Sequence, residues 1–150
     1  MEREVSLLPG QAGMRVRSRI VNRSKTPRRF RPHWFVLFRA GEMNDIHFFK
    51  RAPDGSLADL ANGMRAGTDQ EQWVNLSGRN VPFKLWGFFN PKLTIGMSET
   101  VGRAIEFFGS NGHLHTVHVL TETRLKPITL KPGASVAYER TYRIFHEKPL

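Results

Sequence analysis

Apolar and polar residues alternate along much of the chain with a period of two. Between residues 14 and 20 the even positions are mainly apolar and the odd positions are all arginine, and residues 136–144 alternate similarly. A period of two places neighbouring side chains on opposite faces, so both segments are predicted to be half-buried antiparallel strands. Six further short segments, rich in aromatic or β-branched residues, are also predicted strands: 33–38, 45–49, 84–89, 93–97, 104–108 and 114–120.

Turn residues separate these predicted strands. The sequence Ser-Asn-Gly at residues 110–112 predicts a hairpin between the sixth and seventh of them. Only residues 56–64 favour a short helix, because their apolar residues share one helical face. The prediction is therefore an all-β fold, an antiparallel β-sandwich with at most one short helix, in a single domain over residues 1–150. That domain is either complete or a segment of a longer parent chain.

Composition removes several classes of function. The 150 residues contain no cysteine, which excludes disulfides, zinc sites with Cys ligands and thiol nucleophiles. No segment approaches the roughly 20 apolar residues that a membrane span needs, so no membrane partner is expected. Glu2 and Glu4 do not fit the basic start of a signal peptide. A cytoplasmic location is expected if the chain is complete.

The formal charge of +10 is concentrated in residues 15–31. Eight of the 23 Lys and Arg residues lie there, which leaves 15 against 13 Asp and Glu. The alternation of Arg15, Arg17 and Arg19 indicates the outward face of a sheet. The basic residues at 23–31 fall in the following connection, where they are either solvated or bind a carboxylated or phosphorylated ligand. No nucleic-acid motif accompanies them, so nucleic acid is not expected as a partner.

Two sets of residues are candidates for chemistry. His113 and His115 would share one face of a strand and His118 the other, which gives a two-histidine chelate without a third ligand. No metal site and no cofactor are therefore predicted. Three glutamates, at 99, 106 and 122, are candidates for a general acid or base beside a histidine, and the sequence leaves open which pair converges.

The three tryptophans have two alternative roles. Trp34, Trp73 and Trp86 would either fill the core or offer a ring face to a sugar. Trp73 lies in a polar run, which favours partial exposure for it.

Two stretches together resemble the galactose mutarotase-like supersandwich families. Residues 17–35, RSRIVNRSKTPRRFRPHWF, are similar to a strand that ends in an N-x-[ST] turn with a following Pro and leads to a strand whose histidine faces the cleft. Residues 126–136, KPITLKPGASV, with the strand 138–145, are similar to the closing I-x-L-x-P-G-x-S hairpin of those domains. The resemblance implies a supersandwich fold and a carbohydrate ligand.

The resemblance also implies catalytic positions. His33 matches the cleft histidine and Glu106 the catalytic carboxylate. In an epimerase-like mechanism this His protonates the ring oxygen while the Glu takes the anomeric hydroxyl proton. The chain has about half the usual length, and the His-x-Tyr-x-Asn surroundings are absent at His33. A binding module is therefore favoured over an enzyme; an enzyme would be aldose epimerase-like or a domain associated with polysaccharide lyases.

The function expected from these observations is binding of a carbohydrate, with acidic or phosphorylated sugars favoured by the local basic charge. Arg29 and Arg31, with His33, would hold the anion, and Trp34 or Trp86 would supply the stacking face. The alternative is an immunoglobulin-like interaction module whose basic face meets an acidic protein partner, which the strand count and the chain length also fit.

Overall fold

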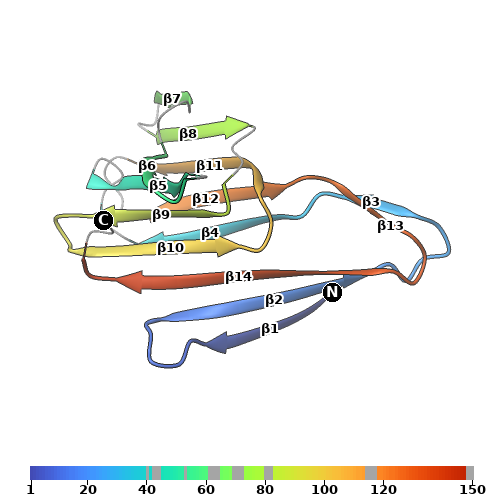
Figure 1. Cartoon of the computed structure of the whole chain (residues 1–150). Coiled ribbons are helices and arrows are strands. Elements are labelled where there is room, and N and C mark those ends of the chain that lie inside the picture. The colour runs from blue at the N-terminus through green and yellow to red at the C-terminus, as the bar shows by residue number, and fades with distance from the viewer. Residues whose placement is uncertain are drawn as a thin grey trace.

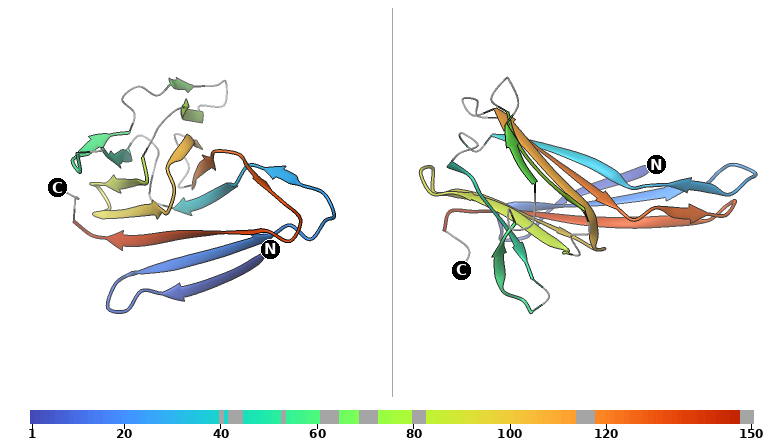
Figure 2. Two further views of the ribbon diagram at one scale, coloured as in Figure 1. Left: turned by 45° about the vertical axis from the view of Figure 1, so that its right-hand side comes forward. Right: turned by 90° about the horizontal axis from the view of Figure 1, so that it is seen from above.

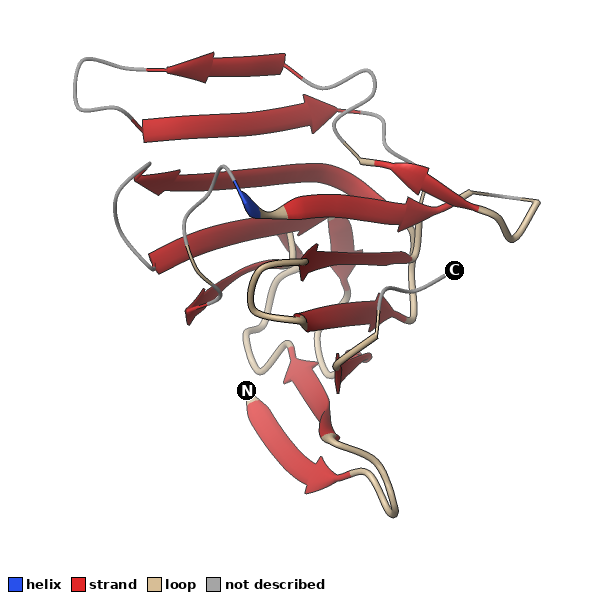
Figure 3. Cartoon of the chain, turned by 90° about the vertical axis from the view of Figure 1, so that its left-hand side faces the viewer, coloured by secondary structure: helices blue, strands red, loops and turns tan. Residues whose placement is uncertain are grey.

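The computed structural model describes residues 1–39, 41, 45–52, 54–60, 65–68, 73–79, 83–113 and 118–147. Within these ranges the chain consists of antiparallel strands and their connections, apart from a single 3-10 turn at Asp45 (Figure 1, Figure 3). No helix among the described residues is long and apolar enough to cross a membrane. The predicted all-β antiparallel sandwich is confirmed.

The larger sheet has seven strands in the order β1-β2-β14-β10-β9-β5-β6. Their bounds are β1 Glu2–Leu7, β2 Gly13–Val21, β14 Ser135–Phe145, β10 Ile95–Val101, β9 Leu85–Asn90, β5 His47–Arg51 and β6 Leu57–Asp59. The first and last parts of the chain therefore lie side by side in this sheet, with β2 paired to β14 along the length of β2.

The second sheet has five strands in the order β4-β12-β11-β8-β7. Their bounds are β4 His33–Arg39, β12 His118–Leu125, β11 Ile105–His113, β8 Trp73–Arg79 and β7 Arg65–Thr68. A ribbon of β3 Arg28–Phe30 and β13 Ile128–Leu130 extends from one end of the two sheets (Figure 2).

Aromatic rings join the two sheets. Trp86 of β9 and Phe108 of β11 are both 0% exposed, and their ring centroids lie 4.8 Å apart. Phe38 of β4 stacks on Phe88 of β9 at 4.3 Å. Burial of such large rings supplies much of the stabilisation of a domain of this size. This core fixes which side of each strand faces outward.

The two stretches that resemble the supersandwich families meet in space. The buried Asn22 side chain donates hydrogen bonds to the carbonyl oxygens of Thr26 and Leu130, each at 2.9 Å. The Gly133 amide in turn donates to the Asn22 carbonyl at 2.8 Å. Asn22 therefore ties the N-x-[ST] turn to the L-x-P-G turn, and β3 pairs with β13 beside it.

Each of the eight predicted strands overlaps a strand of the structure, namely β2, β4, β5, β9, β10, β11, β12 and β14. Residues 93–94 belong to the turn before β10, and residues 114–117 of the predicted strand 114–120 lie outside the described residues. The helix predicted at 56–64 is wrong where the structure describes it, because residues 57–59 form β6, which pairs with β5. The Leu60 amide donates to the Phe48 carbonyl, which continues the attachment to β5. Residues 61–64 lie outside the described residues.

The hairpin prediction is correct in its strands and wrong in its turn. β11 and β12 are antiparallel neighbours, but residues 110–112 are part of β11. Their backbone groups face β12 on one side and β8 on the other, so an extended conformation satisfies both rows of hydrogen bonds. Residues 114–117 lie outside the described residues.

Arg15, Arg17 and Arg19 lie on the outward face of β2, as their alternation with apolar residues predicts. β2 is not an edge strand, because β1 and β14 flank it. Arg15 and Arg17 both contact the Glu139 carboxylate, at 3.3 and 2.9 Å. Arg15 and Arg17 therefore have an ion-pair partner on the neighbouring strand β14. This distinguishes their role from that of the basic residues of β3 and its connections.

Candidate functional site

The outward face of β4 carries an exposed apolar surface next to polar groups. Along β4 the odd residues point outward, and Phe35 and Leu37 are 56% and 66% exposed. His33 begins this row. The neighbouring strand β12 places Arg124 opposite His33 and Glu122 opposite Phe35. Because residues directly opposite each other share a face, the four side chains form one surface.

We call His33, Phe35, Glu122 and Arg124 the outer-face cluster. The Nε2 atom of His33 lies 2.7 Å from Oε1 of Glu122, and the Arg124 guanidinium contacts the same carboxylate oxygen. The His33 ring lies 4.5 Å from the Phe35 ring. The Arg124 guanidinium lies 4.4 Å above the Phe107 ring. One carboxylate therefore holds an imidazole and a guanidinium between two aromatic rings.

Glu106 has a different partner from the one that the resemblance implies. Its Oε2 atom lies 3.6 Å from the Arg31 guanidinium, whereas His33 contacts Glu122. A β-bulge between Ile105 and Phe107 changes the alternation there, so that both Ile105 and Phe108 face the core. Of the three glutamates named from the sequence, Glu122 is the one that contacts a histidine among the described side chains.

The cluster can hold and transfer a proton. A neutral imidazole donates from one ring nitrogen, and a protonated imidazole donates from both, so Nε2 of His33 can donate to the Glu122 carboxylate in either state. An imidazole within hydrogen-bond distance of a carboxylate is also the arrangement used for general acid–base catalysis. Both side chains are only partly exposed, at 33% and 20%.

Trp34 and Trp86 lie on the core side of the sheets. The Trp86 indole is 0% exposed, and its Nε1 donates to Oε2 of Glu99 at 2.7 Å. Trp34 points inward from β4, and its Nε1 donates to Oε1 of Glu99 at 3.0 Å. A wholly buried ring cannot stack on a ligand at the surface, so the expected stacking role of Trp86 does not agree with its position. Phe35 is the exposed ring beside His33. The side chain of Trp73 lies outside the described residues.

The carboxylate between these indoles is the centre of a buried polar network. We call Glu99, Trp34, Trp86, Arg140 and Tyr142 the Glu99 network. The Tyr142 hydroxyl donates to Oε1 of Glu99 at 2.9 Å and accepts from Arg140 at 2.7 Å. The Arg140 guanidinium lies 3.9 Å from Glu99 and 4.8 Å from the Trp34 ring. Burial raises the pKa of Glu99, while Tyr142, Arg140 and the two indoles act in the opposite direction.

One signal of this network is visible in the sequence. Arg140 interrupts the apolar alternation of residues 136–144, and a cation on an inward face requires a buried acceptor. Which carboxylate supplies that acceptor depends on the pairing of β10 with β14, which places Glu99 opposite Tyr142. The network is a structural part of the core rather than a ligand site, since Glu99 is 0% exposed.

Arg29 is a predicted ligand-binding residue outside the outer-face cluster. Arg29 is exposed on β3, opposite Thr129 of β13, and no described interaction joins it to His33. His115 lies outside the described residues, as do the side chains of His113 and His118.

Both tyrosines are expected to resist ionisation in the folded protein. Burial is the main cause that raises the pKa of Tyr138 and of Tyr142, and the Glu99 carboxylate adds to the rise at Tyr142. The folded state therefore binds phenolic protons more tightly than the unfolded state, and stability falls as the pH rises above the ordinary tyrosine value of about 10. For Tyr142 the slope is about 1.4 kcal/mol per pH unit.

A pH titration followed by absorbance at 295 nm measures this directly. The chain has only two tyrosines. We expect the tyrosinate signal of Tyr142 to appear only with the loss of near-ultraviolet circular dichroism, and Tyr138 to ionise above the ordinary tyrosine value. Ionisation of either tyrosine near pH 10 in the folded protein would contradict the buried positions.

Comparisons with known proteins give the fold and no closer relationship. No protein-family model and no curated protein sequence matches the chain. Among solved structures, the Slr1438 protein from Synechocystis sp. PCC 6803 matches with a TM-score of 0.71 and 13% identity, over 93% of this chain and 53% of that one. A candidate aldose 1-epimerase from Klebsiella pneumoniae matches with a TM-score of 0.69 and 15% identity, over 97% and 46%.

A galactose mutarotase-like protein from Lactobacillus casei matches with a TM-score of 0.58 and 12% identity, over 89% of this chain and 59% of that one. The chain spans about half the length of the structures it matches. The fold is therefore that of galactose mutarotase-like sandwiches in a partial or shortened form, as the two sequence stretches predicted.

Proposed function

We propose that the outer-face cluster binds a carbohydrate. The observation that carries this proposal is the exposed Phe35 ring beside a His–Glu–Arg set of hydrogen-bonding groups. A pyranose ring has an apolar face that packs on an aromatic side chain and hydroxyls that need donors and acceptors at the edge. His33 and Arg124 supply donors, and Glu122 supplies an acceptor.

Two exposed arginines that shortly precede β4 in the sequence favour an acidic sugar. Arg29 lies on β3 and Arg31 just after it, both exposed, and Arg31 precedes His33 by two residues and contacts Glu106 at 3.6 Å. A uronate or phosphate group would compete with the Glu106 carboxylate for Arg31, and Arg29 would add a second positive charge. Charge-assisted hydrogen bonds of this kind are stronger than neutral ones.

The fold likeness supports the carbohydrate proposal more than the interaction-module alternative. Proteins named as aldose 1-epimerase or galactose mutarotase-like are among the structures with this fold. An immunoglobulin-like module was predicted from strand count and length alone. A basic face that meets an acidic protein partner remains the competing use of Arg28, Arg29 and Arg31.

A proton-transfer role for the same cluster is the second candidate function. It is favoured by the 2.7 Å contact between His33 and Glu122. In this version His33 protonates the ring oxygen of an aldose. The carboxylate that takes the anomeric proton is Glu122, which touches His33, or Glu106, which the sequence resemblance implies.

Sugar titrations of matched variants test the binding proposal. We expect galacturonate, at millimolar concentration, to raise the melting temperature of the unaltered protein more than galactose does. Phe35→Ala should weaken galacturonate binding about tenfold, because it removes the stacking ring. Leu93→Ala removes another exposed apolar side chain, remote from the cluster, and should change nothing. Equal effects of the two variants, or no response to either sugar, would refute the proposal.

Polarimetry of the same proteins separates binding from proton transfer. If the cluster interconverts aldose anomers, the single variant His33→Ala should lose the rate enhancement. One of the single variants Glu122→Ala and Glu106→Ala should lose it too, which identifies the carboxylate that takes the anomeric proton. Sugar binding without any rate enhancement would leave a binding module. A rate that survives His33→Ala would exclude His33 from catalysis.

A further inference from the structure

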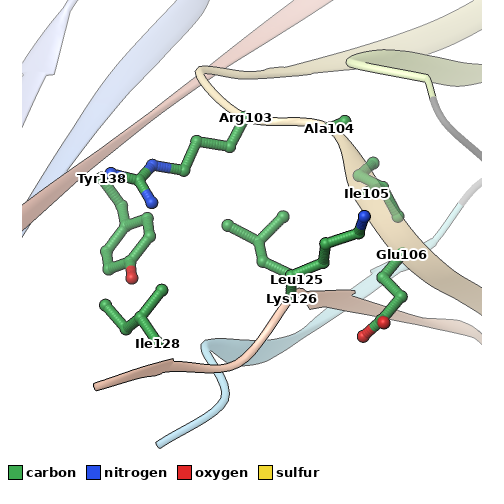
Figure 4. Close-up of a pocket in the computed structure, with 8 residues that line it drawn as sticks. All are labelled: Arg103, Ala104, Ile105, Glu106, Leu125, Lys126, Ile128 and Tyr138. Atoms are coloured by element: carbon green, nitrogen blue, oxygen red, sulfur yellow. The ribbon is translucent and has the colours of Figure 1, made fainter.

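A pocket of about 400 Å³ opens at the end of the sandwich from which the β3–β13 ribbon extends. It lies where the turn between β10 and β11, the end of β12, β13 and β14 come together (Figure 4). This volume is within the range of pockets that hold small molecules. The pocket reaches inward between the sheets, whereas the outer-face cluster lies on the surface of one sheet.

The walls of the pocket are largely apolar. Ile105 and Leu125 are each 1% exposed and belong to the core, and Ile128 of β13 packs against that core. An apolar ligand body placed against this lining would leave water. Burial of such a body is worth roughly 25 cal/mol for each Å² of apolar surface.

One polar group in the pocket has no partner. The Tyr138 side chain is 8% exposed, and its hydroxyl oxygen makes no hydrogen bond to any described residue. Figure 4 shows this hydroxyl at the Ile128 side of the pocket. Buried hydroxyls almost always have a hydrogen-bond partner, so an unpaired one in a pocket indicates a place for an oxygen atom of a ligand.

The charge around the pocket is positive. Arg103 and Lys126 are exposed residues of its lining, and the Arg103 guanidinium lies 5.5 Å from the centre of the Tyr138 ring. The one carboxylate of the lining, Glu106, lies 3.6 Å from Arg31, which offsets its charge. An anionic ligand is therefore favoured over a cationic one.

We propose that this pocket binds a small apolar monocarboxylate, with its hydrocarbon body between Ile105, Leu125 and Ile128 and its carboxylate oxygen accepting a hydrogen bond from Tyr138. Arg103 and Lys126 attract the negative charge. The pocket shares no residue with the outer-face cluster, and Glu106 with its partner Arg31 is the pair that borders both sites.

Titration calorimetry with octanoate tests this proposal, with 1-octanol as the uncharged counterpart. We expect saturable octanoate binding and weaker octanol binding. Tyr138→Phe keeps the ring and removes the hydroxyl, and should weaken octanoate binding up to about tenfold. Arg103→Met should weaken it up to about fivefold, as expected for an exposed ion pair. Arg143→Met, an exposed arginine of β14 outside the pocket, should have no effect.

The melting temperature of unliganded Tyr138→Phe gives a second measurement. If the hydroxyl is reserved for a ligand, its removal leaves the stability unchanged or higher, because no bond inside the protein is lost. A clear fall in melting temperature would instead assign the hydroxyl a structural role and overturn the proposal. Equal binding of octanoate and octanol, no saturable binding, or equal weakening by all three variants would also overturn it.

Discussion

Glu99→Ala is expected to destabilise the folded protein by about 3–5 kcal/mol, which is the usual cost of removing one partner of a buried ion pair. The substitution leaves the Arg140 charge without its counter-charge and the indole N–H groups of Trp34 and Trp86 without acceptors. A loss of this size is a large part of the total stability of a typical domain. Urea denaturation followed by tryptophan fluorescence measures it.

Two companion variants keep this prediction testable. Glu139→Ala removes an exposed carboxylate that contacts Arg15 and Arg17, and should cost far less. Adding Arg140→Met to Glu99→Ala removes the uncompensated charge, so the double variant should recover part of the loss. If Glu99→Ala and Glu139→Ala were equally stable, the Glu99 network would not be an important part of the core.

Phe108→Ala is expected to cost about 3–5 kcal/mol, as for other large rings removed from a core. Phe108 is 0% exposed, and its ring lies against Trp86 at 4.8 Å and against Phe48 and Phe83 at 6.2 Å each. It joins β11 of one sheet to β9 and β5 of the other. Its loss should therefore weaken the contact between the sheets.

Phe35→Ala is the matched comparison for this prediction. It makes the same change on the same sheet, at a side chain that is 56% exposed, and should alter stability by no more than about 0.5 kcal/mol. Denaturant midpoints of the two variants measure the contrast. Similar midpoints would mean that the two rings are not on opposite sides of the sheet.

The strands with clear alternation could be predicted from the sequence, and the short strands could not. The alternation of apolar and polar residues at 14–20 and 136–144 is enough to predict half-buried strands. β3 and β13 have three residues each, too few to show a period, and they exist because each pairs with the other. The sequence of β6 predicts a helix because its apolar spacing fits a helix as well as a strand. Its pairing with β5 makes it a strand.

The candidate site could be predicted in its residue types but not in its pairs. His33 and Glu122 lie on β4 and β12, and their contact depends on a register that one sequence does not contain. The bulge in β11 also changes the surroundings of Glu106 in a way that alternation alone misses. Trp34 and Trp86 are ambiguous in the sequence for a different reason, because an indole is suited both to a core and to a sugar. Their hydrogen bonds to the buried Glu99 place them in the core.

The inward and outward residues of β4 follow one another without a break, which makes the strand a practical template for redesign. Substitutions at the exposed Phe35 or Leu37 would change the outer surface at little risk to folding, whereas Trp34 and Phe38 would tolerate little change. Inserting or deleting a single residue within β4 would exchange these two sets. A library that varies only the odd positions would therefore present new outer surfaces on an unchanged scaffold.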